Sequence, residues 1–167
     1  MKSRAIATIA LPLLLAACAG TQPRFPTEGI NTEVTPHAAL RQADAAVGQQ
    51  VLWGGVIVTS SNLADSTQIE VLAYPLDSDQ RPNTDRTPSG RFLAVKPGYL
   101  ETADFAAGRL ITVQGTLQQS ATGKVGEADY TYPVVRIADT QLWKRETAST
   151  LDSRPRVNFG VGVMIGR

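Results

Sequence analysis

Residues 50–59 read Gln-Val-Leu-Trp-Gly-Gly-Val-Ile-Val-Thr, and this stretch does most to decide the fold. Its β-branched and aromatic residues favour a strand. The pair Gly54 and Gly55 interrupts that strand, and glycine inside a strand marks either a bulge or the sharp bend of a small barrel. The stretch therefore predicts a first strand that bends within a closed or nearly closed β-barrel.

Turn residues separate the remaining strand candidates at regular intervals. The strands predicted after the first are 67–76, 91–95, 110–117, 130–137 and a short last one at 141–143. Gly115 is a second candidate bulge. The segment 108–115, followed by 132–143, resembles the last two strands of an OB-fold. We therefore expect a mainly β protein with a small antiparallel, OB-like barrel, with other small barrels and sandwiches as alternatives.

One short helix is expected before the first strand. Thr35 has the side chain of an N-cap, Pro36 suits the first helical position, and the helix should end near Gly48. His37, the single histidine, falls in the first turn and is expected at the surface. The polar stretch 77–90 follows the second strand, and loops of this length are either functional or mobile.

The first 18 residues have the features of a secretory signal. Lys2 and Arg4 precede an apolar run of 11 residues, 5–15, which is too short to span a bilayer. The sequence Leu-Ala-Ala-Cys at 15–18 then has the lipobox pattern, in which the cysteine is acylated and becomes the new N-terminus. The run therefore predicts a lipoprotein signal peptide that is removed.

Cys18 is the only cysteine of the chain, which excludes an internal disulfide. Three acyl chains on Cys18 would hold the protein on a membrane in effect permanently, because each buried methylene contributes about 0.8 kcal/mol. Ala19 stands where enterobacterial lipoproteins retained in the inner membrane carry Asp. We therefore expect a chain anchored in outer-membrane lipid by Cys18.

The chain is expected to divide into four parts. These are a signal peptide at 1–17, a lipidated N-terminus and tether at 18–36, a β-barrel domain at 37–145, and a linker with a glycine-rich strand at 146–167. In the last part, apolar residues alternate with small ones from 157 to 165. This pattern predicts a strand that completes the sheet or, alternatively, a segment that docks on a partner or the membrane surface.

Composition argues against several classes of site. Without the signal peptide's Lys2 and Arg4, 14 of the 16 basic residues remain against 15 acidic ones, so no basic field attracts nucleic acid. One histidine and one cysteine provide neither a catalytic triad nor a zinc site. Glu101 and Asp104 are a possible carboxylate pair for a hydrolase, although acidic residues are mostly exposed. We expect no metal, no cofactor, no nucleic-acid partner and no enzymatic activity.

Four segments carry a resemblance to a known family. They read VLWGGVIV at 51–58, IEVLAYPLDSDQRPNTD at 69–85, GRFLAVKPGYLETADFAAGRLITVQGTL at 90–117 and GKVGEADYTYPVV at 123–135. Together with the lipobox they resemble the Slp family of outer-membrane lipoproteins. This resemblance implies a lipid-anchored envelope protein associated with starvation or stationary phase, no established enzymatic activity, and acylated Cys18 as the one functional residue.

Two functions remain open at this point. The first is a non-enzymatic lipoprotein whose β domain binds a protein or another envelope component through the 77–90 loop and the C-terminal strand. The second is a module that binds a small ligand at the mouth of the barrel. The residues expected to line that mouth are Trp53, Tyr74, Arg91 and Tyr99.

Overall fold

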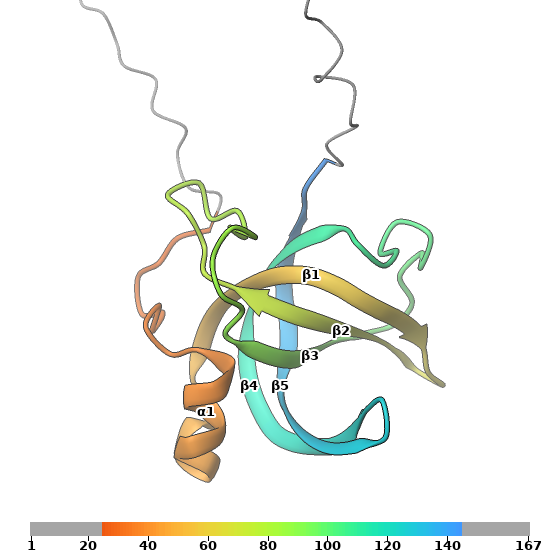
Figure 1. Cartoon of the computed structure of the whole chain (residues 1–167), viewed down its shortest axis with the longest axis horizontal. Helices are drawn as coiled ribbons and strands as arrows, with labels where there is room; N and C mark the ends of the chain where they lie inside the picture. Colours follow the sequence, from red (N-terminus) through yellow and green to blue (C-terminus); the bar gives the residue numbers. More distant parts are fainter. Residues whose placement is uncertain (1–24, 145–167) are drawn as a thin grey trace, which may run out of the picture.

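The structure is a computed structural model, and it describes residues 25–144. Its elements are α1 (Pro36–Gln42), a 3-10 turn η1 (Ala43–Ala46), β1 (Gln50–Asn62), β2 (Ser66–Tyr74), β3 (Gly90–Pro97), β4 (Leu110–Val125) and β5 (Ala128–Leu142). The strands close a barrel in the order β1-β2-β3-β5-β4, in which only β3 and β5 are parallel (Figure 1). This strand order confirms the predicted mainly β, OB-like barrel.

The long strand β1 curves across the barrel (Figure 1). Its first half pairs with β4 and its second half pairs with β2, so it joins the two sides of the barrel. Gly54 and Gly55 are the turning point, because both pair with β2 and with β4. A Cβ atom on Gly55 would lie 2.0 Å from the carbonyl oxygen of Leu72. The glycines therefore mark the predicted bend, whereas the β1 bulge lies further on, between Ile57 and Thr59.

The strands β4 and β5 form a hairpin that extends beyond the barrel. The predicted bulge is confirmed by a register shift between Gln114 and Gly115. Two predictions were wrong: the strand predicted at 110–117 runs on as far as Val125, and the two strands predicted at 130–137 and 141–143 are the single strand β5. Many side chains of this hairpin arm (118–134) are exposed, so its polar composition concealed the strand.

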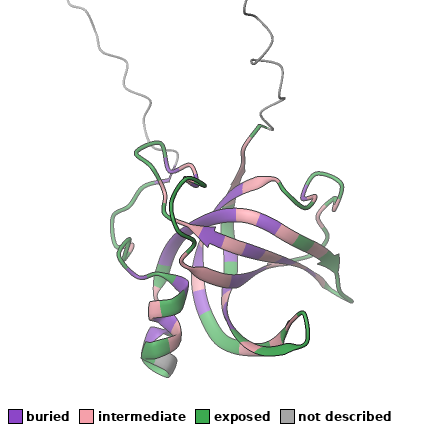
Figure 2. Ribbon diagram, viewed as in Figure 1, coloured by how far each residue is buried: buried purple, intermediate pink, exposed green. Residues whose placement is uncertain are grey.

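The interior of the barrel is apolar. Buried and partly exposed side chains alternate along β2, as expected for a strand with one face on the core (Figure 2). Trp53 and Phe92 meet edge to face in this core, with 5.3 Å between ring centroids. The side chains with no exposed surface in this core are Val51, Ile69, Val71, Phe92, Ala94, Ile111, Val113 and Val135.

Residues 25–35, which we call the N-terminal strap, pack against the barrel. Phe25 has 1% of its surface exposed and Val34 has 7%. Because these two apolar side chains are buried, residues 25–35 belong to the folded domain, although the sequence placed them in the predicted tether 18–36. No helix within residues 25–144 is long and apolar enough to cross a membrane.

The helix α1 begins as predicted. The Thr35 hydroxyl oxygen accepts a hydrogen bond from the Ala38 N–H at 3.2 Å, which is the contact of an N-cap. The helix ends at Gln42, earlier than predicted, and the 3-10 turn continues towards Gly48, which has a φ of 86°. His37 is exposed. The predicted glycine-rich C-terminal strand lies outside the described residues.

Candidate functional site

The strap, the start of β1, the end of β2 and the loop that follows β2 line a cavity of about 460 Å³ that is partly open to solvent. We call it the strap cavity. Its size falls within the range of roughly 300–1,000 Å³ that is typical of small-molecule sites. Its apolar wall consists of Val34, Pro36, Leu52, Trp53, Ala73, Pro75 and Leu76.

The cavity exists because β1 and β2 diverge. The first pair between these strands is Gly54 with Tyr74, and the residues of β1 before Gly54 pair only with β4. The strap crosses the resulting gap. A Cβ atom on Gly54 would lie 2.7 Å from Cδ2 of Leu76 and 2.9 Å from Cγ of Pro82, so glycine lets the loop after β2 approach β1.

Two side chains fix the strap in place. The indole Nε1–H of Trp53 donates to the carbonyl oxygen of Val34 at 2.6 Å. The amide of Gln80 makes a reciprocal pair with the backbone of Phe25, accepting from its N–H at 2.9 Å and donating to its carbonyl at 2.7 Å. Because these hydrogen bonds are buried, they hold the strap in position as one wall of the cavity.

Gln80 also ties the loop to the barrel. Its carbonyl oxygen accepts from the Thr112 hydroxyl at 2.6 Å, and its φ of 63° makes it the one non-glycine residue with positive φ among residues 25–144. Left-handed backbone in a residue other than glycine costs energy and persists where surrounding contacts impose it. Here those contacts are the Thr112 hydroxyl and the backbone of Phe25.

The rest of the 77–90 loop is also hydrogen-bonded internally. The Asp77 carboxylate accepts from the N–H groups of Asp79 and Arg81, both at 2.9 Å. Leu76 and Pro82 form an isolated bridge. These contacts give the loop a defined backbone, in which Gln80 is buried while Asp77, Ser78, Asp79 and residues 84–88 are exposed.

Gln80→Ala is expected to lower the free energy of unfolding by about 2 kcal/mol, because it removes two buried hydrogen bonds worth roughly 1 kcal/mol each. The measurement is urea unfolding of the mature polypeptide. Gln118→Ala is the matched control, since Gln118 is exposed and its amide contacts only nearby carbonyls. Equal losses in the two variants would contradict the role of Gln80.

The structure separates the four residues expected at the barrel mouth. Trp53 and Tyr74 both line the strap cavity. Arg91 lies outside it, in an ion pair on the outer face of the barrel. Tyr99 is 68% exposed, and its hydroxyl donates to a backbone carbonyl in the β1–β2 turn at 2.6 Å. Two of the four residues therefore share one site.

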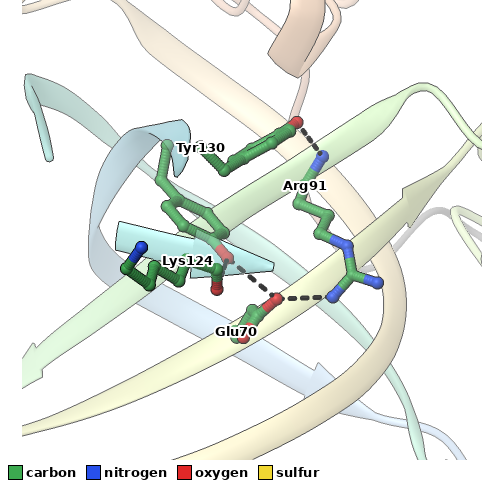
Figure 3. A network of polar contacts seen from close by, with 5 residues as sticks. Glu70, Arg91, Lys124 and Tyr130 are labelled. Atoms are coloured by element: carbon green, nitrogen blue, oxygen red, sulfur yellow. Dashed lines mark hydrogen bonds and ion pairs between the residues drawn. The ribbon is translucent and has the colours of Figure 1, made fainter. Parts of the chain in front are cut away.

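The surroundings of Arg91 form a second polar cluster (Figure 3). Its guanidinium pairs with the Glu70 carboxylate at 2.6 Å, and its backbone N–H donates to the Tyr130 hydroxyl at 3.1 Å. The Tyr132 hydroxyl lies 3.3 Å from Oε1 of Glu70 and 3.1 Å from the Lys124 carbonyl oxygen. The hairpin arm thereby covers part of the β2–β3 face, which is the ligand-binding face of many OB-folds.

The contacts of Tyr132 in this cluster predict that the free energy of unfolding depends on pH. Burial, and next the negative charge of Glu70, raise the pKa of the Tyr132 phenol above its ordinary value of about 10. The folded state therefore favours the neutral phenol, and its contribution is complete below about pH 10 and is lost as the pH rises through the folded-state pKa.

Tyr132→Phe should accordingly cost about 1 kcal/mol at neutral pH, and the cost should shrink above about pH 10. Urea unfolding of the parent and the variant across this range measures the difference. The parent and the variant share the other tyrosines, so the titration of those groups cancels in the difference between the two proteins. A cost that stays constant up to about pH 11 would contradict the stated cause.

The carboxylates of the hydrolase alternative lie elsewhere. Glu101 and Asp104 are exposed in the connection between β3 and β4, and neither lines the strap cavity. The Glu101 carboxylate accepts from the N–H of Ala103 at 3.4 Å, as in an ordinary turn. Within residues 25–144, no three side chains of His, Cys, Asp or Glu gather closely enough to hold a metal ion.

Comparison with known proteins gives one family match and several relatives. The model of the outer membrane lipoprotein Slp family matches residues 15–161. The outer membrane protein Slp of Escherichia coli K12 is 29% identical over 146 residues, 85% of this chain and 76% of its own. The E. coli lipoprotein YeaY is 34% identical over 97 residues, and an uncharacterized protein of Haemophilus influenzae is 39% identical over 95 residues. The match with YeaY covers 58% of this chain and 50% of YeaY, and the match with the H. influenzae protein covers 56% of this chain and 51% of that protein. The chain thus spans about half the length of these two relatives.

Solved structures with similar chain traces are single-stranded DNA-binding proteins. One from Streptomyces coelicolor has 16% sequence identity and a TM-score of 0.36, with coverage of 57% of this chain and 94% of its own. The mitochondrial protein of S. cerevisiae has 13% identity and a TM-score of 0.39, with coverage of 60% and 99%.

Proposed function

Since this chain belongs to the outer membrane lipoprotein Slp family, we propose that it is a lipid-anchored binding protein held in the outer membrane by acylated Cys18, and that its strap cavity binds a small ligand. The observation that supports the binding role is the cavity of about 460 Å³ with its apolar wall. The proposal assigns the domain no enzymatic activity. It carries over from the family resemblance a role during starvation or stationary phase.

A docking surface for an envelope protein is the second candidate. Its expected contacts were the 77–90 loop and the C-terminal strand. The loop directs Gln80 inwards to the strap and β4, and the strand lies outside the described residues. Loop residues 84–88 are exposed and available to a protein partner, whereas the concave apolar wall of the strap cavity favours a small ligand.

Single-stranded nucleic acid is a poor fit for this barrel. Such ligands need a positively charged groove and exposed aromatic side chains for base stacking. Residues 25–144 contain nine Lys and Arg against 13 Asp and Glu. On the β2–β3 face, Arg91 is neutralised by Glu70, and Tyr132 is 3% exposed.

The ligand proposal is tested with the neutral fluorescent probe N-phenyl-1-naphthylamine. The protein is the mature polypeptide, residues 18–167, which is expressed without the signal peptide and carries Cys18→Ser so that it is not acylated. Ser89→Trp should weaken probe binding by at least about tenfold, because Ser89 lines the cavity and the indole would occupy part of its volume.

Thr84→Trp is the matched control for that experiment. Thr84 is an exposed residue of the same loop and does not line the cavity. The control should bind the probe as the parent does. Equal affinities of the Ser89→Trp variant and the parent, or no probe binding at all, would refute the proposed site.

A further inference from the structure

Most of the polar residues that line the strap cavity carry a hydroxyl group. These residues are Thr27, Thr32, Thr35, Tyr74, Ser78 and Ser89. Hydroxyl groups both donate and accept hydrogen bonds, so they suit a neutral polar head at the edge of an apolar wall. No lysine, arginine or histidine is among the described residues that line the cavity.

Asp77 is the one charged side chain among the cavity's lining residues. Its carboxylate is held by the two backbone N–H groups of Asp79 and Arg81. The nearby cations are directed elsewhere, since the Arg81 guanidinium lies over the Trp143 ring at 5.6 Å and Arg91 pairs with Glu70. An anionic ligand would therefore meet the Asp77 carboxylate, and no residue within 25–144 that lines the cavity carries a positive charge.

The start of α1 borders the cavity, and its backbone N–H groups are already used. The His37 N–H donates to the Ser89 carbonyl at 3.4 Å, and the N–H groups of Ala38 and Ala39 donate to the hydroxyl and carbonyl oxygens of Thr35. Pro36 has no N–H. The helix thus offers none of the donors by which helix N-termini bind phosphate or carboxylate.

We infer that the strap cavity selects an uncharged amphiphile, with an alkyl or aryl body against the apolar wall and a hydroxyl or amide head at the rim, and rejects carboxylates and phosphates. This inference rests on the proposed function of the cavity. The anchor suits such a ligand: six residues lie between Cys18 and Phe25, and the seven residue steps that join these two span at most about 25 Å when extended. An acylated Cys18 therefore keeps the cavity close to a membrane surface, where uncharged amphiphiles partition.

The test compares decan-1-ol with decanoate, which share one alkyl chain and differ in charge at neutral pH. Each competes with N-phenyl-1-naphthylamine on the mature polypeptide, and the Ser89→Trp variant reports binding outside the cavity. Decan-1-ol should displace the probe at a concentration at least about tenfold lower than decanoate does.

Asp77→Asn identifies the source of the selectivity. The amide keeps an acceptor oxygen for the loop but removes the charge. The concentrations of decan-1-ol and decanoate that displace the probe should therefore differ less than they do with the parent. Asp79→Asn is the matched control, because Asp79 belongs to the same loop and does not line the cavity. This variant should leave the difference between the two displacing concentrations as it is in the parent.

Two failures can be told apart. If decanoate binds as tightly as decan-1-ol or more tightly, the inference about charge is overturned while the cavity remains a binding site. If neither the probe nor either ligand binds, the proposed function itself is overturned and the inference falls with it.

Discussion

Gly55→Ala should lower the free energy of unfolding by about 3 kcal/mol or more, which is the upper range for overpacked cores. The added Cβ would lie 2.0 Å from the Leu72 carbonyl oxygen and 2.9 Å from Cα of Ala73. Both are backbone atoms of β2, so no side-chain rotation relieves the overlap. The expected result is an unfolding midpoint far below that of the parent in urea, or a polypeptide that does not fold.

Gly123→Ala provides the control for this prediction. A Cβ on Gly123 would lie 3.1 Å from Cε2 of Tyr132, a ring that can shift by a few tenths of an ångström. Gly123 lies in the hairpin arm, away from the point where β1 joins both sides of the barrel. This variant should cost about 1 kcal/mol or less. A loss from Gly55→Ala no larger than this would show that β1 does not require glycine at its bend.

Cys18→Ser should abolish membrane anchoring through lipid. A serine hydroxyl does not replace the thiol to which the proposed diacylglyceryl group would be attached, so the chain should accumulate as an unprocessed precursor. Incorporation of labelled palmitate and the mass of the protein measure this outcome. Ala19→Asp is the matched variant, because it should keep acylation and retain the protein in the inner membrane where the enterobacterial sorting rule applies. A Cys18→Ser protein found mature in the outer membrane would contradict the anchor.

The local signals in the sequence predicted the elements that local chemistry controls. Gly54 and Gly55 identified the bend of β1, Gly115 identified a bulge, and Thr35 identified the start of α1. Each of these features depends on the conformational range or the hydrogen bonding of a residue and its near neighbours. The fold class followed, because the turns were spaced as they are in a small barrel.

The candidate site was harder to predict because long-range contacts build it. Phe25 and Gln80 are 55 residues apart, and nothing in the sequence around either of them indicates that they pair. Arg91 was placed at the barrel mouth, but its position in β3 sets it on the outer face beside Glu70. The strap escaped prediction because Phe25 and Val34 are isolated apolar residues in a segment rich in turn formers.

The most direct test of ligand binding in the strap cavity uses the two indole N–H signals of the mature polypeptide in a nitrogen–proton correlation spectrum. The chain has two tryptophans, and Trp143→Phe assigns the signals by removing one. Trp53 lines the cavity and donates to Val34, whereas the Trp143 indole donates to Thr112 and does not line it. Titration with decan-1-ol should shift the Trp53 signal progressively to saturation and move the Trp143 signal much less. An unmoved Trp53 signal at saturating ligand would contradict the account.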